Sequence, residues 1–515
     1  MGIQNDSFIS NFDHCVFDMI KLSVIIITIC FISPHIIDNE IYANDEKSIS
    51  IQYPPNYAGI QRIDESHGDI IIQGIYSGSP SSIEAQFNSE EWEIIDQNPF
   101  DGKFSGKLFN QKIGQGDLIV RFTNDSRINN TANHISIGDV FVIAGQSNAL
   151  GQANYTQRLD KENEFITTIF YGNFPIIKNS GLEITLISNG TIMKKSVDGF
   201  FKTNEWFEGP YEDHSPFPLV SNIIMQKENV PISFIQTSTN GGGIELWQKD
   251  TNNTYEKMIH YITKATNGNM NIKAILFFQG ESDTYLDHFN TYDNYKNNVQ
   301  TLVQNLFNDT NTEKFILGQI GETPERHSKI ATSKIQKAQQ DLWSSENILS
   351  GPITYDIGPL SDNLHFITDE EIRELSNRWG ISILRGVYEH DIPTNPELVD
   401  STIENHRINK KIIQKKITLV FDKKINLENW MKEEGSAMKG LYIKDGIEEF
   451  DHTDFQIKII DNKVILRTNQ NISNYASMSY PIGSESAGEY SIRETSNNSL
   501  PMKPIYQVIL HHNST

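Results

Sequence analysis

The sequence predicts an α/β fold in which a parallel sheet covered by helices is flanked along the chain by two all-β regions. Between residues 137 and 392, short apolar stretches alternate with segments of helical spacing, a pattern typical of parallel sheets with helices on both faces. On either side of this region, apolar residues recur at every second position, which is the period of a half-buried strand. A chain of 515 residues is also long enough for several domains.

The period of two governs residues 44–136 and 393–515. In the first region the alternating apolar side chains are Ile49, Ile51, Tyr53, Ile83, Ala85 and Phe87, followed by a strand over 118–122. In the second they are Ile417, Leu419 and Phe421, with a hairpin over 455–466 and a closing strand over 505–510. We therefore expect an N-terminal β-sandwich-like domain and a C-terminal β domain.

The central region contains four strand candidates, at residues 140–144, 232–235, 274–278 and 315–317. Helical spacing is present at 255–262 and 292–306, and Thr368 with Glu371 forms a capping box ahead of a further helix. Ligands of such sheets bind beyond the carboxyl ends of the strands. The residues that directly follow each strand are therefore the candidates for chemistry.

Charge and cysteine content exclude several classes of function. The chain has 66 Asp and Glu against 43 Lys and Arg, a formal charge of -23, and a surface this acidic repels phosphate backbones. We expect no nucleic-acid partner. The two cysteines, Cys15 and Cys30, both lie near the N-terminus. The rest of the chain therefore has no disulfide, Cys-ligated zinc or Cys nucleophile.

The N-terminal segment is expected to be a signal peptide. The apolar run over residues 22–32 follows Lys21 and ends before Pro34. It is shorter than the roughly 20 residues that a membrane-spanning helix needs. We expect residues 1–43 to be removed on export to the periplasm, cell surface or medium, leaving no stable membrane span. Met19 is an alternative start, and a buried or anchoring helix is the alternative interpretation of the run.

Three of the polar segments that follow predicted strands supply a nucleophile and hydrogen-bond donors. In Gly145-Gln146-Ser147-Asn148, a Ser lies on a tight turn ahead of a helix. Consecutive glycines at 241–243 allow a close approach of backbone N–H groups to a ligand. Gln279 offers a side-chain amide beside Gly280. Taken alone, the Ser segment and the glycine run are better explained as a helix cap and a flexible loop, and the Gln279 segment is equally well explained as a helix cap.

A fourth segment supplies an acid and a base. Asp362 precedes His365 by three residues, a spacing that lets a carboxylate orient the imidazole toward a nucleophile. Asp64 and His67 have the same spacing in the first β region, so this second pair remains an alternative. The four segments together supply nucleophile, donors, acid and base, for which coincidence is a poor explanation.

These segments resemble those of the SGNH hydrolases, and most closely those of the sialate O-acetylesterase group of carbohydrate esterases. The resemblance covers about residues 138–390 and implies a three-layer parallel-sheet hydrolase core. It also implies Ser147 as nucleophile and Asp362 with His365 as the rest of a triad. The implied oxyanion donors are the Ser147 amide, the Gly242 amide and Gln279, with Gly241 as an alternative to Gly242. No metal or organic cofactor is implied.

Four further residues are candidates to line the site: Gln146, Glu245, Trp247 and Glu281. The resemblance implies that acetyl esters on sugar hydroxyls are hydrolysed through an acetyl-serine, with an O-acetylated glycan or sialic acid as substrate. A charge of -23 would repel a sialate carboxylate unless cations such as Arg158 or Arg326 offset it, so acetylxylan esterase is the alternative. A non-catalytic glycan-binding protein is the alternative of another class. The sequence does not determine the oligomeric state.

Overall fold

The computed structural model describes most of the chain after the N-terminal segment. The described residues are 47–151, 167–176, 195–203, 215–251, 254–286, 290–324, 327–357, 364–366, 368–407, 413–427, 438–481, 492–495 and 500–512. The expected signal peptide, Arg158, Arg326 and Asp362 lie outside these residues. Residues 46–515 form one compact unit. No helix in this described part is long and apolar enough to cross a membrane.

A parallel sheet forms the centre of the fold. Its strands follow the order β10-β9-β11-β8-β12-β13-β14, and all neighbours are parallel except β10, which pairs antiparallel with β9 at one edge. The strands are β8 (Asp125–Gly145), β9 (Thr167–Ile176), β10 (Lys195–Thr203), β11 (Ile232–Gln236), β12 (Ala274–Phe278), β13 (Phe315–Leu317) and β14 (Ile348–Ser350). The four predicted strands of this region are confirmed as parts of β8, β11, β12 and β13.

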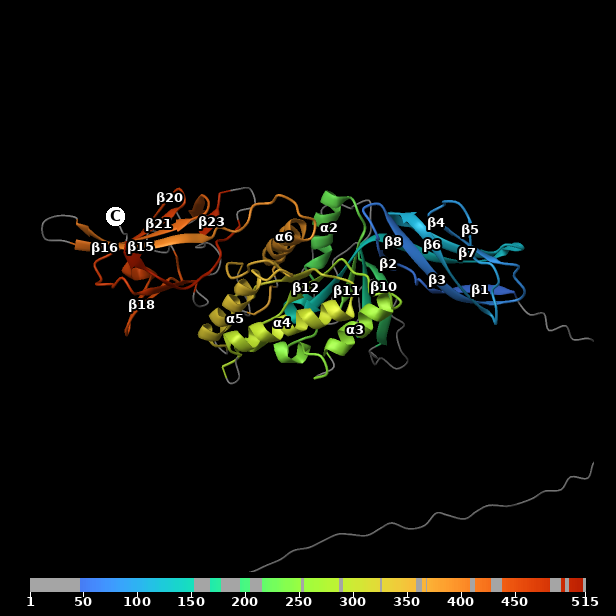
Figure 1. Ribbon diagram of the computed structural model, residues 1–515, viewed down its shortest axis with the longest axis horizontal. Helices are drawn as coiled ribbons and strands as arrows, with labels where there is room; N and C mark the ends of the chain where they lie inside the picture. Colours follow the sequence, from blue (N-terminus) through green and yellow to red (C-terminus); the bar gives the residue numbers. More distant parts are fainter. Residues whose placement is uncertain are drawn as a thin grey trace, which may run out of the picture. The chain divides into compact units, whose positions relative to one another are not determined.

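Helices cover both faces of this sheet (Figure 1). One face carries α2 (Phe217–Glu228) and α6 (Asp369–Gly386), and the other carries α3 (Thr254–Ala265), α4 (Tyr292–Asp309) and α5 (Lys329–Leu342). Successive side chains of a strand point to opposite faces. In β8, Phe141 and Ile143 accordingly pack with α2 and α6, whereas Val140 and Val142 pack with the other three helices. The predicted α/β class is confirmed.

The predicted helices are also present. Residues 255–262 lie in α3, and residues 292–306 lie in α4. At the start of α6, the Glu371 N–H donates to Thr368 Oγ1 at 3.3 Å, and the Thr368 N–H donates to Glu371 Oε2 at 2.9 Å. The capping box is therefore confirmed with both of its hydrogen bonds.

The N-terminal strands are continuous with the central sheet. They are β1 (Ser48–Tyr53), β2 (Gly59–Gln61), β3 (His67–Ser77), β4 (Ile83–Phe87), β5 (Glu93–Asp96), β6 (Lys103–Lys112) and β7 (Gly114–Phe122). Strand β7 pairs with the first half of β8, whose second half lies between β11 and β12. The predicted boundary between residues 136 and 137 thus falls inside one strand. The division into separate domains remains a prediction.

The C-terminal strands have their own apolar core. They are β15 (Leu398–Arg407), β16 (Ile413–Phe421), β17 (Ile425–Leu427), β18 (Tyr442–Asp445), β19 (Glu448–Asp451), β20 (Gln456–Ile460), β21 (Lys463–Thr468), β22 (Ser477–Tyr480), β23 (Ile492–Glu494), β24 (Ile505–Ile509) and β25 (His511–His512). Strands β20 and β21 form the predicted hairpin, with Ile460 opposite Lys463 across the turn. The alternation predicted around Ile417 is confirmed in β16.

Candidate active site

A glycine places Ser147 at the end of the central strand. Gly145, the last residue of β8, has φ 131°, and a Cβ there would lie 2.0 Å from the Phe278 carbonyl oxygen of β12. Only glycine therefore permits this approach of the two strands. The Gln146 N–H donates to the same carbonyl at 3.0 Å. Helix α1 (Ser147–Leu150) begins immediately afterwards, so the Ser147 side chain lies at the carboxyl edge of the sheet.

His365 is the base that lies beside this serine. Its Nε2 is 3.0 Å from Ser147 Oγ, a hydrogen-bond distance suited to proton transfer. Ser147 is 6% exposed and His365 is half-buried. In the alternative pair, His67 donates its backbone N–H to Asp64 Oδ1 at 2.8 Å within the first β region. The geometry therefore favours His365, although Asp362 lies outside the described residues.

Asn148 holds the backbone on both sides of His365. Its Nδ2 donates to the Leu364 carbonyl at 3.0 Å, and its Oδ1 accepts from the Phe366 N–H at 3.3 Å. The same Nδ2 also donates to Glu281 Oε1 at 2.7 Å. Asn148 is 4% exposed. This role of Asn148 was not predicted from the sequence, where its position directly after the proposed nucleophile was the signal available.

Two buried carboxyl groups lie behind the site. Glu281 begins the 3₁₀ turn η2 (Glu281–Thr284), and burial raises its pKa to about 7 although the hydrogen bond from Asn148 opposes the shift. Burial likewise raises the pKa of Asp283 to about 6. Glu281 thus titrates near neutral pH, close to the residue that holds the His365 segment.

This raised pKa predicts a pH-dependent stability. Between pH 4.5, the ordinary pKa of Glu, and about 7, the unfolded chain releases the Glu281 proton while the folded protein retains it. The free energy of unfolding should therefore fall as the pH rises through this window. Glu281→Gln, whose side-chain oxygen still accepts from Asn148 but which does not titrate, should remove roughly 2.5 kcal/mol of the fall between pH 5 and pH 7.5. Urea unfolding at pH 5 and pH 7.5 measures the difference.

Asp283 is present in both proteins, so most of its own titration cancels in this comparison. Glu346→Gln, at an exposed position, is the matched control and should follow the wild type. An equal fall in stability for wild type and Glu281→Gln would contradict the assignment.

The glycine loop after β11 is held by Gln279 and Asp283. Gly242 has φ 90°, and a Cβ there would lie 2.4 Å from Leu246 Cδ1. Gln279 Nε2 donates to the Gly242 carbonyl at 3.2 Å and also to Asp283. Asp283 Oδ1 accepts from the Ile244 N–H at 3.0 Å. The fully buried Gln279 amide is thus engaged within the protein, so donation to an oxyanion requires it to release one of these bonds.

The candidates to line the site differ in their placement. Gln146 is buried, and its Oε1 accepts from the Ser282 N–H at 3.3 Å. Glu245 is exposed at the start of the 3₁₀ turn η1 (Ile244–Trp247). Trp247 is fully buried in edge contact with Phe277, with 5.3 Å between ring centroids. It has no surface to offer a ligand, because its ring fills the core beneath the sheet, and this corrects the expectation that it lines the site.

The central region matches a family of known enzymes. Residues 137–380 match the model of the family described as "Carbohydrate esterase, sialic acid-specific acetylesterase". This region belongs to that carbohydrate esterase family. The esterase-family region contains Ser147, Gly242, Gln279, Asp362 and His365, all the residues predicted for the triad and the oxyanion hole.

Individual relatives are more distant. A "probable carbohydrate esterase" of Arabidopsis thaliana is 27% identical over 157 residues, which are 29% of this chain and 54% of the relative. The chain thus matches about half the length of this curated relative. A crystal structure of a carbohydrate acetylesterase from Xanthomonas citri is 14% identical, with a TM-score of 0.58 over 88% of this chain and 97% of that one. This similarity shows a shared fold.

A family two carbohydrate esterase from Cellvibrio japonicus is 11% identical, with a TM-score of 0.30 over 66% of this chain and 95% of that one.

Proposed function

We propose that this protein is a serine carbohydrate O-acetylesterase that hydrolyses acetyl esters on sugar hydroxyls. The observation that carries the proposal is the 3.0 Å hydrogen bond between Ser147 Oγ and His365 Nε2 at the carboxyl edge of the sheet, inside the esterase-family region. A fold alone does not determine an activity. A serine paired with a histidine at the place where such sheets bind ligands supports nucleophilic acyl transfer.

In the proposed mechanism, His365 removes the Ser147 Oγ proton as the oxygen attacks the acetyl carbonyl carbon. The protonated His365 then gives this proton to the departing sugar oxygen, and the C–O bond to the sugar breaks. In the second half, His365 takes a proton from water as the water oxygen attacks the acetyl carbonyl carbon. The C–O bond to Ser147 Oγ then breaks, His365 returns the proton to Ser147 Oγ, and acetic acid leaves. Asp362 is proposed to hold the imidazole in the required tautomer, and Asn148 holds the backbone that carries it.

The tetrahedral intermediate requires donors for its oxyanion. Ser147 is the first residue of α1, and the N–H groups of a first helical turn have no acceptor within the helix. We propose this N–H together with those of Gly242 and Gln279, where the loss of one donor typically lowers kcat by ~10²–10³. To donate to the oxyanion, the Gln279 amide would give up its hydrogen bond to either Gly242 or Asp283.

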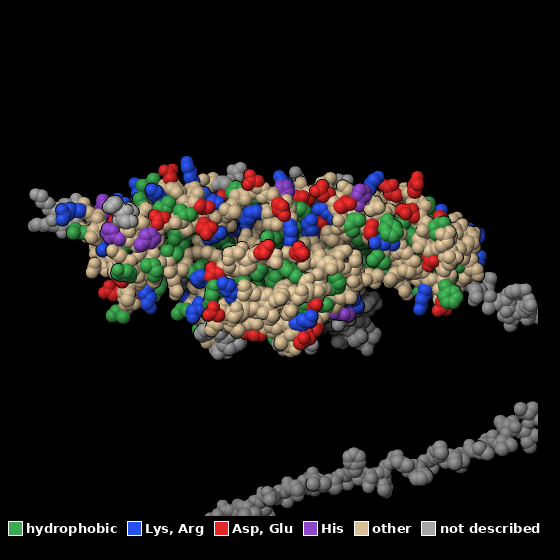
Figure 2. Space-filling view, viewed as in Figure 1, with side chains coloured by type: hydrophobic (Ala, Val, Ile, Leu, Met, Phe, Trp, Pro, Cys, Tyr) green, Lys and Arg blue, Asp and Glu red, His purple; other side chains and the backbone are tan. Residues whose placement is uncertain are grey.

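The proposed substrate is an O-acetylated sialic acid, which the description of the matched family supports. Electrostatics favours the second candidate, a neutral glycan such as acetylated xylan, because the net charge is -23. Figure 2 nevertheless shows Lys and Arg side chains interspersed with Asp and Glu on the face in view. An anionic sugar would therefore not meet a uniformly acidic surface there.

The substrates are distinguished by comparing kcat/KM for an O-acetylated sialoside with that for an acetylated xylo-oligosaccharide. We expect at least a tenfold preference for the sialoside. Added salt should raise kcat/KM for the sialoside alone, because screening weakens the long-range repulsion between like charges. A preference for the xylo-oligosaccharide would favour the neutral-glycan candidate. Binding of both glycans without release of acetate would leave the glycan-binding alternative in place of the esterase.

We also propose that the protein is exported, which the apolar run at residues 22–32 supports. N-terminal sequencing of the exported protein should give a start near residue 44. Retention of residues 1–43 in that protein would contradict cleavage.

A further inference from the structure

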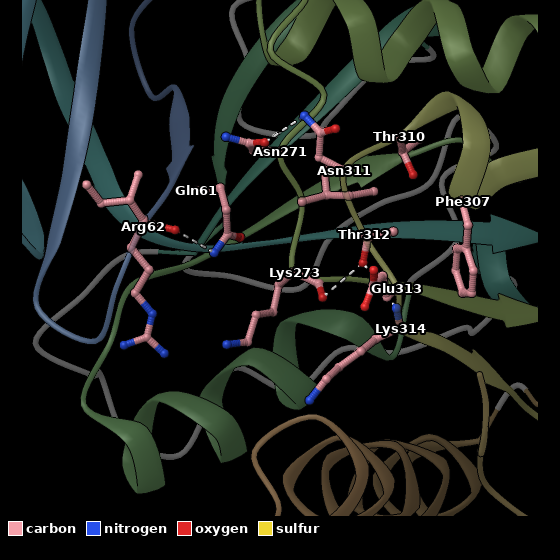
Figure 3. Close-up of a pocket in the computed structure, with 12 residues that line it drawn as sticks. Gln61, Arg62, Asn271, Lys273, Phe307, Thr310, Asn311, Thr312, Glu313 and Lys314 are labelled. Carbon is pink, nitrogen blue, oxygen red and sulfur yellow. Dashed lines mark hydrogen bonds between the residues drawn. The ribbon is translucent and has the colours of Figure 1, made fainter. Parts of the chain in front are cut away.

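A cavity lies at the edge of the sheet opposite Ser147. It has a volume of about 770 Å³ and is lined by three segments, residues 61–63, 271–273 and 307–314 (Figure 3). Two of these segments immediately precede β12 and β13, so the cavity lies at the amino ends of strands whose carboxyl ends face the serine. The proposed ester hydrolysis makes no use of it.

Each segment contributes one cation to the cavity. Figure 3 shows that the charged ends of Arg62, Lys273 and Lys314 extend to the same side. The Arg62 guanidinium donates to the two carboxylate oxygens of the buried Asp139 at 2.9 and 2.8 Å. Asp139 also accepts from the Tyr388 hydroxyl at 2.7 Å. The negative charge of Asp139 is therefore already paired with the positive charge of Arg62.

Lys273 is the cation left in excess. Its Nζ is 3.8 Å from Asp139 Oδ1 and makes no hydrogen bond to the described residues. It lies 5.1 Å from the centroid of the Tyr388 ring, with 26% of the side chain exposed. Burial lowers the pKa of Lys273, and the neighbouring Arg62 and Lys314 lower it further against the opposing effect of Asp139. A bound anion would offset the repulsion of the Lys273 ammonium by the positive charges of Arg62 and Lys314.

The other charges around Lys273 have partners or are exposed. Lys314 Nζ donates to the Val387 carbonyl at 2.9 Å and is 3.3 Å from Glu389, whose side chain is 80% exposed. Glu228 is bonded to His390 at 2.5 Å. Glu313, also part of the cavity lining, is exposed. A bound anion would therefore compete with Glu389 for Lys314. It would not have to displace a hydrogen-bonded partner among the described residues in order to bind Lys273.

We propose that this cavity binds a small organic anion whose carboxylate or phosphate group accepts hydrogen bonds from Lys273 and Lys314. Its volume falls within the ~300–1,000 Å³ that is usual for small-molecule sites. Arg62 holds Asp139 and keeps its charge neutralised. The proposed anion site is inferred from these contacts and does not depend on the proposed esterase activity.

Calorimetric titration of the full chain at low ionic strength tests the proposal, with sodium glucuronate, inorganic phosphate and neutral glucose as probes. We expect saturable binding of at least one anion and none of glucose, and the tighter anion identifies the preferred group. Lys273→Met should weaken binding at least tenfold, whereas Lys257→Met, at an exposed position on α3, should have no effect. Absence of saturable binding for both anions, or equal binding by Lys273→Met, would overturn the proposal.

Lysine acetylation followed by peptide mass spectrometry keeps the test valid if Lys273→Met does not fold. In the wild-type protein, a saturating anion should slow the acetylation of Lys273 at least threefold and leave that of Lys257 unchanged. An unchanged rate at Lys273 would overturn the site. Ser147→Ala should bind the anion as the wild type does, which separates this site from the proposed esterase site.

Discussion

Replacement of Ser147 by Ala is expected to abolish ester hydrolysis, lowering kcat/KM by roughly 10⁴-fold or more. The substitution removes the oxygen that forms the acetyl-enzyme bond. It should leave the fold intact, because the lost side-chain hydrogen bond is the one to His365 and Ser147 directly follows the fully buried end of β8. Release of nitrophenol from an acetyl ester measures the rate, and the thermal unfolding temperature checks that the variant is folded.

Two histidine variants complete this experiment. His365→Ala should lose activity by a similar factor, because Ser147 then has no base to accept its proton. His67→Ala is the matched control, since its exposed pair with Asp64 lies in the first β region, and it should retain wild-type activity. A wild-type rate of hydrolysis in Ser147→Ala would refute the proposed role of Ser147 as the nucleophile of an esterase. A large loss in His67→Ala alone would show that the other pair carries the chemistry.

Replacement of Asp356 by Asn is expected to lower the free energy of unfolding by about 3–5 kcal/mol. Asp356 is fully buried between Arg378 at 2.5 Å and Arg493 at 2.7 Å. Burial alone would raise its pKa, but the two guanidinium groups outweigh burial and lower it. Asn keeps the shape and removes the charge, which leaves two largely buried cations without the carboxylate that lies between them, while both still lie near Glu374. Urea unfolding measures the loss.

The matched control for this variant is Glu404→Gln. Glu404 pairs with Lys416 at 2.7 Å across two strands, with side chains 35% and 26% exposed. Solvent screens such a pair, so its loss should cost less than about 1 kcal/mol. A loss in Asp356→Asn no larger than that in Glu404→Gln would contradict the importance of the buried pair. Because Arg493 lies in β23 and Arg378 in α6, the experiment also tests whether this carboxylate joins the C-terminal strands to the central region.

The elements found from sequence are those whose local pattern is strong. Residues 274–278 are five consecutive apolar residues, the pattern of a strand buried on both faces, and they form β12. Helix α2 was not predicted, because its first five residues are all buried and leave no polar face to mark a helical period. Helix α5 was also missed. Its buried face includes Gln336, which donates to the Ile320 carbonyl at 3.1 Å, and such polar residues do not register as an apolar stripe.

Within the candidate site, the residue types that follow each strand can be read from the local sequence, because the strand pattern and the glycine at 145 are local properties. Which of these residues come into contact depends on long-range packing. The parallel pairing of β8 with β12 brings Ser147 beside the segment that follows Phe278, and the chain then returns His365 to Ser147 across 218 positions.

The same long-range packing gave Asn148 its hold on the His365 segment and engaged the Gln279 amide with the glycine loop. It also gathered Arg62, Lys273 and Lys314 around one cavity from three separate segments. None of these partners is close in sequence. Their choice depends on the order of strands in the sheet, which is set by the burial of whole strand faces rather than by any local motif.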